Sequence, residues 1–254
     1  MIHFVGAGPG AADLITVRGM QLIRSADVII YAGSLVNPEL LGYAKPDTEV
    51  FNSAFMTLEE VIREMRRAHA QGKEVVRLHT GDASIYGAVR EQMDLLDAEG
   101  IPYDSCPGVS ACFGAAASLN LEYTLPGVTQ TLIVTRMAGR TPVPEREKIP
   151  RLAEHGASMA VYLSSGMLDR LSEELIRGGY DPDTPAALVY RATWPEEEKY
   201  VCTVGTLAET GREHQITRTA VVLVGDAVAH AEYDRSRLYD PSFSTGYRKA
   251  GRAH

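Results

Sequence analysis

A glycine-rich turn almost at the start of the chain limits what the chain can fold into. Residues 2–5 form an apolar run, and residues 6–10 hold three glycines at alternate positions, with a proline between the last two. A short apolar run before such a turn is typical of a buried strand in a parallel sheet. Glycines let the backbone approach a ligand closely, and ligands bind at the carboxyl edge of these sheets. We therefore expect residues 6–10 to line a binding site.

Segments with strand and helix patterns alternate after this turn. The sequence predicts helices at 16–24, from Thr57 to Gly72, at 88–98 and at 110–118, and strands at 27–31, at 74–78 and near 103. Thr57 and Glu60 have the spacing of a capping box. In the helix at 16–24 we expect Val17, Met20 and either Ile23 or Arg24 on one face, with Thr16 as the N-cap. Strands that alternate with helices imply a parallel sheet with right-handed crossovers.

The alternation breaks near the dipeptide Pro126-Gly127, which indicates a domain boundary. We expect one domain at 1–122, a second at 123–240 and a loose tail at 241–254. Further strands and helices are predicted in the second half, with strands at 129–135, 159–163, 186–190, 199–204 and 219–224 and helices at 147–154 and 168–177.

Composition excludes several classes of protein. No apolar run in the 254 residues approaches the roughly 20 that cross a membrane, and the start lacks the layout of a signal peptide. The three cysteines and seven histidines have no metal-binding spacing. A net charge of −8 argues against broad binding to nucleic acid. We expect a cytoplasmic protein with no membrane contact, no nucleic-acid partner and no metal site.

The first glycine turn also fits the generic dinucleotide pattern, with Gly6, Gly8 and Ala11 in its three slots. A nicotinamide site wants an acid at the end of the second strand, yet the acid there, Asp27, lies at the opposite end. Pro9 also removes an amide donor where the phosphate-binding helix should begin. A nicotinamide-dependent oxidoreductase and a simple tight turn remain the alternatives for this stretch.

A second loop with functional character follows the strand at 74–78. Residues 80–82 place a threonine, a glycine and Asp82 together at the carboxyl edge of the sheet. A carboxylate there can accept hydrogen bonds from ribose hydroxyls or an amino group. Asp82 also stands just before a predicted helix, where capping alone would account for it. The residues themselves leave both roles open.

Four stretches, at 6–10, 14–16, 81–87 and 107–111, resemble the tetrapyrrole methyltransferase family. Its members use S-adenosylmethionine to methylate corrinoid and sirohaem precursors. Further stretches are similar to one branch, which acts on a corrin precursor, and these lie at 31–36, 79–82, 136–144 and 190–195. The sequence departs from the family pattern at Ala11, where an acid often stands, and at Ala83, where a proline is usual.

The resemblance implies two α/β domains, with a mainly parallel N-terminal sheet, a mixed C-terminal sheet and the active site in the cleft between them. It also implies the residues that contact S-adenosylmethionine: Pro9, Thr80, Gly81, Asp82, Ile85, Ser110, Ala111, Leu163, Ala192 and Ala220. For an anionic tetrapyrrole substrate we expect contacts with Gly8, Gly10, Arg136, Arg140 and Arg191, because arginine clamps carboxylates and glycine leaves room for the macrocycle. A surface ion pair is the alternative role for each arginine.

The implied reaction is attack of a ring carbon on the sulfonium methyl, which leaves S-adenosylhomocysteine. Positioning and exclusion of water are the main tasks of such an enzyme, so we predict no protein nucleophile and name no catalytic base. The resemblance also implies a homodimer. Alternatives are another member of the family, acting on a different precorrin, uroporphyrinogen, RNA ribose or a modified protein histidine, and a binding protein without enzymatic activity.

Overall fold

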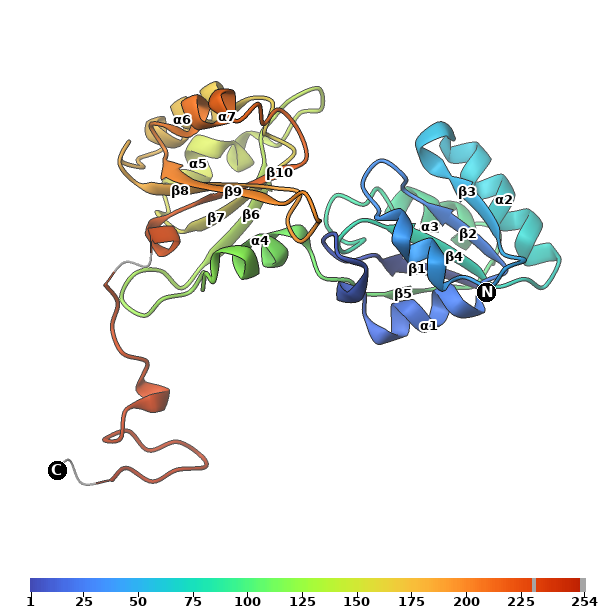
Figure 1. The fold of residues 1–254 in the computed structure, drawn as a ribbon, viewed down its shortest axis with the longest axis horizontal. Coiled ribbons are helices and arrows are strands. Elements are labelled where there is room, and N and C mark those ends of the chain that lie inside the picture. Colours follow the sequence, from blue (N-terminus) through green and yellow to red (C-terminus); the bar gives the residue numbers. More distant parts are fainter. Residues whose placement is uncertain (230–231, 252–254) are drawn as a thin grey trace. The chain divides into compact units, whose positions relative to one another are not determined.

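The computed structural model describes residues 1–229 and 232–251, and the chain forms two compact units (Figure 1). The first unit comprises Met1–Ala115 and Arg191–Glu197, and the second comprises Ala116–Tyr190 and Glu198–His254. The boundary expected at 122/123 therefore differs from the observed division in two ways. The chain changes unit within a helix, and a short segment of the second half returns to the first unit.

The first unit contains a five-stranded parallel sheet in the order β3-β2-β4-β1-β5. Its strands are β1 (Ile2–Gly6), β2 (Val28–Tyr31), β3 (Glu49–Asn52), β4 (Val75–His79) and β5 (Tyr103–Cys106). The parallel sheet confirms the prediction. Sequence reasoning missed β3, because this four-residue edge strand is only partly buried and lacks a continuous apolar run.

Four α-helices follow strands of the first sheet: α1 (Val17–Ser25), α2 (Leu58–Ala70), α3 (Arg90–Asp97) and α4 (Ala111–Leu119). The capping box at the start of α2 is present, with Thr57 and Glu60 bonded to each other's backbone N–H. The face predicted for α1 is wrong at Val17, which is 69% exposed, whereas Ile23 is buried and Met20 packs partly buried against the same apolar cluster. The Thr16 side chain caps the N–H of Gly19, which makes Val17 the first helical residue and leaves it facing outward.

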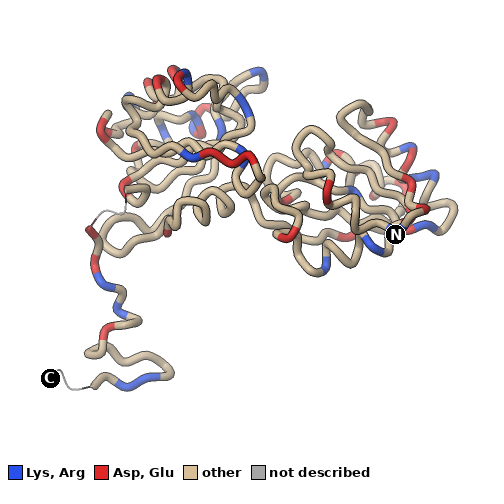
Figure 2. The backbone as a smooth tube through the Cα atoms, in the orientation of Figure 1, with Lys and Arg blue, Asp and Glu red and all other residues tan. Residues whose placement is uncertain are grey.

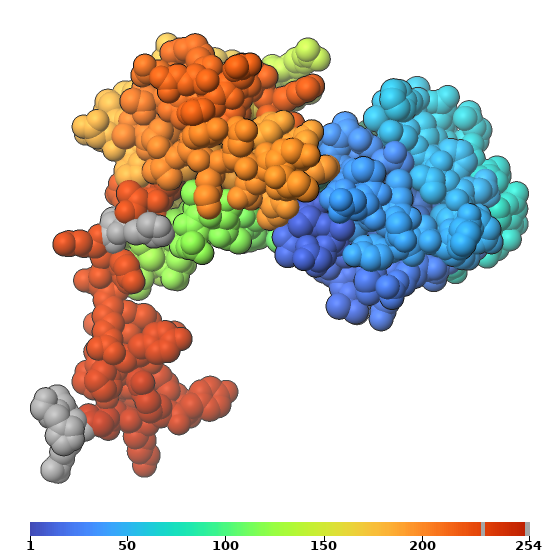
Figure 3. All heavy atoms as spheres, viewed as in Figure 1, coloured from blue at the N-terminus to red at the C-terminus, as the bar shows by residue number. Residues whose placement is uncertain are grey.

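Apolar clusters cover both faces of the first sheet. One cluster joins residues of β1, β2 and β4 to α1 and to the η2 turn (Pro38–Tyr43). The other joins alternate residues of the same strands to α2 and α3. The two-sided burial is what a parallel sheet with crossover helices requires. Within the first unit, atoms fill the space between the ribbons of Figure 1 (Figure 3), and Figure 2 shows charged residues along its helices and loops.

The second unit contains a five-stranded mixed sheet in the order β6-β7-β10-β8-β9. Its strands are β6 (Leu132–Arg136), β7 (Ser158–Tyr162), β8 (Pro185–Tyr190), β9 (Glu198–Thr203) and β10 (Ala220–Val224). The central strand β10 runs antiparallel to both of its neighbours. This arrangement confirms the predicted α/β class, with a mainly parallel N-terminal and a mixed C-terminal sheet.

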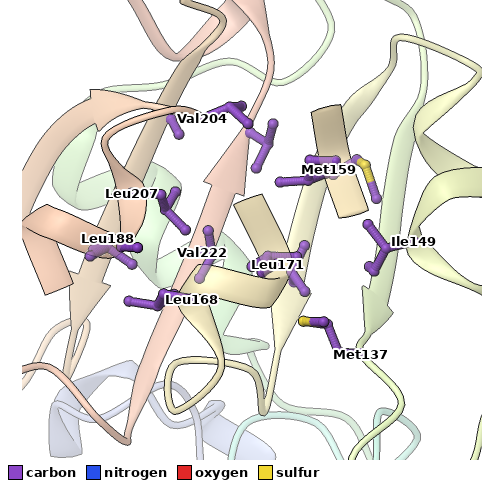
Figure 4. Packing of buried hydrophobic residues seen from close by; sticks show 14 of the residues in the cluster. Met137, Ile149, Met159, Leu168, Leu171, Leu188, Val204, Leu207 and Val222 are labelled. Carbon is purple, nitrogen blue, oxygen red and sulfur yellow. The ribbon is translucent and has the colours of Figure 1, made fainter. Parts of the chain in front are cut away.

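Three helices pack on one face of the second sheet: α5 (Ile149–Ala153), α6 (Leu168–Arg177) and α7 (Leu207–Glu213). Figure 4 shows their apolar side chains, among them Leu171 and Leu207, pointing at Leu188 and Val222 of the sheet. Sequence reasoning missed α7, which has a glycine within its seven residues. The glycine, Gly211, allows α7 to pack closely against α6, because a Cβ at this position would lie 2.2 Å from Leu168 Cδ1.

The chain after β10 contains short 3₁₀ turns. Within the described residues 232–251 it forms no α-helix or β-strand, and one 3₁₀ turn, η6, spans Arg237–Tyr239. The last three residues of the predicted loose tail, 252–254, lie outside the described residues. In the described part of the chain no helix is long and apolar enough to cross a membrane.

Candidate functional site

Three loops of the first unit meet backbone to backbone at the carboxyl edge of its sheet. Gly8, in the loop after β1, and Gly81, in the loop after β4, form a bridge with N–H to O distances of 3.2 and 2.9 Å. Gly108 belongs to the loop after β5, and a Cβ added to it would lie 2.2 Å from the Gly81 carbonyl oxygen. A Cβ on Gly6 would lie 2.6 Å from Gly108 Cα. Only glycine at positions 6 and 108 allows this approach.

The Asp82 carboxylate fastens two of these loops together. Its Oδ2 accepts the Gly108 N–H at 2.8 Å, and its Oδ1 accepts the Ser84 N–H at 2.9 Å as well as the Ser84 hydroxyl. Burial opposes ionisation of Asp82, but these hydrogen bonds outweigh it and hold the pKa of the carboxyl below its ordinary value. Asp82 therefore carries a negative charge at neutral pH.

The helix-capping role considered for Asp82 is wrong in detail. The helix that follows, α3, begins at Arg90 after an N-cap at Val89 that has no side-chain bond. Asp82 instead closes a local turn, in which the Ile85 N–H donates to the Asp82 carbonyl at 3.2 Å. The sequence placed the carboxylate correctly at the sheet edge but could not show its link to Gly108, 26 residues away.

The structure brings most of the cofactor contacts predicted for the first half of the chain to these loops. The Thr80 hydroxyl donates to the Leu35 carbonyl at 3.3 Å, and Gly81 adopts a positive φ of 58°. A Cβ on Gly81 would lie 3.6 Å from Ser110 Cα, next to Ala111 at the start of α4. Ile85 is 37% exposed, on the outer side of the loop after β4.

Gly8, Pro9 and Gly10 are all buried. The Gly10 carbonyl accepts the Asn37 side-chain N–H at 3.0 Å, and a Cβ on Gly10 would lie 2.2 Å from Trp194 Cδ1. We expected Gly10 to leave room for the substrate, but the space beside this glycine is filled by the indole of Trp194. The glycine is needed because another part of the protein packs against it.

Trp194 belongs to the segment 191–197, which joins β8 to β9 and packs in the first unit. The Thr193 hydroxyl oxygen accepts the Ala11 N–H at 3.0 Å, and the Thr193 N–H donates to Glu197 Oε2 at 2.6 Å. Thr193 has a φ of 71°, a conformation that costs on the order of 1–3 kcal/mol in a residue other than glycine. Predicted contact Ala192 is buried in the same segment.

Sequence reasoning did not identify Asn37, Thr193, Trp194 or Glu197 as part of this site. The signal that could have found Thr193 and Trp194 was the similarity of 190–195 to one family branch, a stretch that ends before Glu197. Asn37 lies just after the branch-like stretch at 31–36. The contacts of Asn37, Thr193 and Trp194 with the glycine loop join residues 27 to 184 positions apart, so no local pattern shows them.

The remaining predicted contacts lie at one edge of the second sheet. Because β10 is antiparallel, its first residue, Ala220, lies beside Tyr190 at the end of β8. Arg136 ends β6 beside Tyr162, and Leu163 follows directly, 64% exposed and with a φ of 53°. The mixed topology therefore places Arg136, Leu163 and Ala220 along the same edge of this unit.

The three arginines expected at the substrate differ in their surroundings. Arg136 donates to the carbonyls of Met137 at 3.1 Å, Thr141 at 3.2 Å and Pro142 at 2.9 Å, so it fastens its own loop. Arg191 pairs with Glu196 at 3.2 Å, and its guanidinium lies 5.2 Å from the centroid of the Trp194 ring.

Arg140 is exposed, and no hydrogen bond or ion pair holds its side chain within residues 1–229 and 232–251. Of the three arginines, Arg140 is therefore the one whose donors are accessible for a carboxylate.

The loops of the first unit fit the cofactor that the resemblance implied. The predicted contacts there are small or apolar residues, together with one ionised carboxylate, Asp82. This set suits a ligand with a positive sulfonium, an amino group and no phosphate. Gly81 is buried with a positive φ, and its N–H and carbonyl are both bonded to Gly8.

A profile of the family described as Tetrapyrrole (Corrin/Porphyrin) Methylases matches residues 1–208. The chain is 51% identical to a cobalt-precorrin-4 C(11)-methyltransferase of Methanocaldococcus jannaschii, over 98% of this chain and 96% of the relative. It is 42% identical to a precorrin-4 C(11)-methyltransferase of a Sinorhizobium species, over 98% of this chain and 99% of the relative.

Solved structures give a similar result. A cobalt precorrin-4 methyltransferase matches with a TM-score of 0.88 and 46% identity, over 89% of this chain and 95% of that one. A uroporphyrin-III C-methyltransferase from Thermus thermophilus, solved with S-adenosylhomocysteine, matches with a TM-score of 0.74 and 26% identity, over 91% of this chain and 95% of that one.

Proposed function

Because the chain belongs to the tetrapyrrole methylase family, as its sequence predicted, we propose that it transfers a methyl group from S-adenosylmethionine to carbon 11 of precorrin-4 or its cobalt complex. The observation that carries the proposal is the near-full-length similarity to enzymes named for this reaction. The chain is thus a methyltransferase of cobalamin biosynthesis.

The residues of the first unit hold the cofactor in this proposal. Pro9, Thr80, Gly81, Ser110 and Ala111 offer backbone groups and small side chains to it, and Ile85 adds apolar contact. When bound, the cofactor supplies a methyl group on a sulfonium, which is already a strong electrophile.

Asp82 has two effects on this site. Its negative charge favours a cationic ligand, and its bond to Gly108 fixes the distance between the loops that hold that ligand. We assign the predicted contacts Leu163, Ala192 and Ala220 to the same cofactor, S-adenosylmethionine.

The substrate carries many carboxylates, while the protein has a net charge of −8, so its binding needs local positive charge. We assign this task first to Arg140, since its donors are accessible. Arg136 and Arg191 keep a secondary role, because both already bond within the protein. No residue is assigned as nucleophile, because a positioned ring carbon can attack the methyl group directly.

The experiment that tests this function supplies the protein with labelled S-adenosylmethionine and precorrin-4, and separately with the cobalt complex. We expect a singly methylated product in mass spectrometry, with the label at carbon 11 in the carbon NMR spectrum. A label at another ring position would assign the chain to a different reaction of the family. Absence of transfer to either substrate would contradict the proposal.

Calorimetry separates the methyltransferase from a nicotinamide-dependent oxidoreductase. We expect tight binding of S-adenosylhomocysteine and no heat from NAD(H) or NADP(H); the opposite result would favour the oxidoreductase. The homodimer and the cytoplasmic location are further proposals that the resemblance supports. Light scattering on the purified protein tests the dimer, since a single chain has a mass of 27.6 kDa.

A further inference from the structure

The segment 191–197 makes contacts with the glycine loop that the proposed function does not yet use. The chain leaves the second unit after Tyr190, contributes seven residues to the first unit and returns at Glu198. Pro9, a predicted cofactor contact, lies in the glycine loop, and Ala192, another predicted cofactor contact, lies in the segment 191–197. The segment is therefore placed to control the position of the cofactor site.

Thr193 is held in an unusual conformation by one bond to its side-chain hydroxyl and one from its backbone N–H. Its φ of 71° is rare for a residue branched at Cβ. The bond from the Ala11 N–H to its hydroxyl and the bond from its own N–H to Glu197 fix this conformation. Such backbone strain persists where the surroundings over-determine it, and it concentrates at functional sites.

Trp194 covers the last glycine of the loop. A Cβ on Gly10 would lie 2.2 Å from Trp194 Cδ1 and 2.8 Å from the Ala192 carbonyl oxygen. The Trp194 indole and the Ala192 backbone therefore both pack closely against Gly10. Further bonds hold the segment in shape, from the Trp194 N–H to the Arg191 carbonyl at 2.9 Å and from the Glu197 N–H to the Trp194 carbonyl at 3.0 Å.

Pro9 and Thr193 also pack against the same point of α4. A Cβ on Gly114 would lie 2.8 Å from Pro9 Cβ and 3.2 Å from Thr193 Cγ2. Pro9 therefore has α4 on one side and, through Gly10 and Ala11, the segment on the other. A shift of the segment would displace Pro9 and Ala192 together.

From these contacts we infer that Thr193 and Trp194 are positioning residues for the cofactor: by clamping residues 9–11 they hold Pro9 and Ala192 in the arrangement that binds S-adenosylmethionine. Neither residue takes part in methyl transfer itself. The inference rests on the proposed function, because it concerns the same cofactor site.

The first test displaces the indole. In Gly10→Ala the new Cβ cannot coexist with Trp194 and the Ala192 carbonyl, so the segment must move. Trp194 is the one tryptophan in the sequence, and its fluorescence reports the movement directly. We expect a red-shifted emission and a dissociation constant for S-adenosylhomocysteine at least about tenfold higher, measured by calorimetry. The matched control is Gly42→Ala, since nothing lies within 4 Å of a Cβ at that position.

The second test removes one hydrogen bond and keeps the shape. In Thr193→Val the Ala11 N–H loses its acceptor, and we expect the KM for S-adenosylmethionine to rise about fivefold, as the loss of one hydrogen bond would give, with a much smaller change in kcat. Thr193→Ser restores the hydroxyl and should return KM close to the wild-type value. Thr48→Val is the control, because it also removes a hydroxyl that bonds the backbone of the first unit, in this case by donating to the Ala26 carbonyl at 2.9 Å.

The outcomes separate this inference from the proposed function. If the wild-type protein does not bind S-adenosylhomocysteine, the proposed function fails. If it binds, and Gly10→Ala shifts the emission while the dissociation constant and KM stay unchanged in both variants, the segment has only a structural role and the inference is overturned. A loss of thermal stability in Thr193→Val equal to that of Thr48→Val, with an unchanged KM, would overturn it as well.

Discussion

The central strands of the two sheets are equally buried but chemically different. In the first unit β4 reads VVRLH, and in the second unit β10 reads AVVLV. Each strand has five buried residues and lies in the middle of a five-stranded sheet. The third position is Arg77 in β4 and Val222 in β10. The two sheets therefore bury their central strands in different ways.

In β4 the charge of Arg77 is compensated by groups from other elements. Arg77 donates to Gln92 Oε1 of α3 and to the Ile30 carbonyl of β2, both at 3.1 Å. Burial lowers its pKa to about 10, so it still carries its charge at neutral pH. His79 lies on the same face, with its ring 6.2 Å from that of Phe4, and its Nε2 has no hydrogen-bond partner within the described residues.

In β10 the neighbours are apolar. Val222 lies beside Val161 and Leu188 and packs under α6 and α7 (Figure 4). The comparison teaches that a buried strand accepts a charge only where acceptors reach it, because an isolated buried charge is strongly unfavourable. In the first unit Gln92 and a strand carbonyl supply them. The following predictions test this difference, beginning with the largest effect.

Val222→Arg copies the third residue of β4 into β10. We expect the second unit to lose more than about 4 kcal/mol of unfolding free energy, because the guanidinium would be buried without acceptors. Urea unfolding followed by circular dichroism measures the change. A loss below about 1 kcal/mol would show that the second sheet accommodates a charge as the first does and would remove the contrast.

Gln92→Leu removes one acceptor of Arg77 while keeping the side chain's approximate volume. We expect a loss of about 2–3 kcal/mol in the unfolding free energy of the first unit, as for a hydrogen bond to a buried charged group. The double variant Gln92→Leu with Arg77→Met should recover part of this loss, since the unpaired charge is then gone. If the single variant were as stable as the wild type, Gln92 would not be what makes Arg77 tolerable.

His79 should make the first unit sensitive to acid. Burial, and after it the charge of Arg77, lowers the pKa of His79 to about 3, while the unfolded chain has the ordinary value near 6.5. The unfolded state therefore takes up the proton first as the pH falls. Stability is complete above about pH 6.5 and decreases from there toward about pH 3, by about 2 kcal/mol at pH 5.

Urea unfolding at pH 7.5, 6 and 5 measures this dependence. His79→Phe keeps a ring beside Phe4 and cannot be protonated, so its stability should fall less steeply over the same interval. Equal slopes for the wild type and this variant would show that His79 does not take up its proton on unfolding.

The sequence predicted most of the elements, and particular residues explain where it failed. The α6 bounds of Leu168–Arg177 and the α2 cap at Thr57 follow from local periodicity and capping, which act over three or four residues. The edge strand β3 was missed, and the face of α1 was wrong at Val17. Both depend on how the element meets the rest of the sheet, which a short window does not contain.

The candidate site shows the same division. The sequence marked the glycine turn, the loop at 80–82 and the stretch at 107–111, because the glycines and Asp82 stand directly after predicted strands. It did not show that Gly10 lies under Trp194, or that the Asp82 carboxylate reaches Gly108. These contacts exist only once the chain has folded.

The sequence by itself determined the α/β class, the family and the place of the glycine-containing loops, because apolar periodicity, strand-end glycines and each family motif are contained in a few consecutive residues. Only the tertiary structure decided that Arg77 could be buried, that Asp82 ties two loops together and that Thr193 and Trp194 clamp the glycine loop. The reason is physical: hydrogen bonding and close packing depend on distances of a few ångströms between atoms that the chain separates by tens to hundreds of residues.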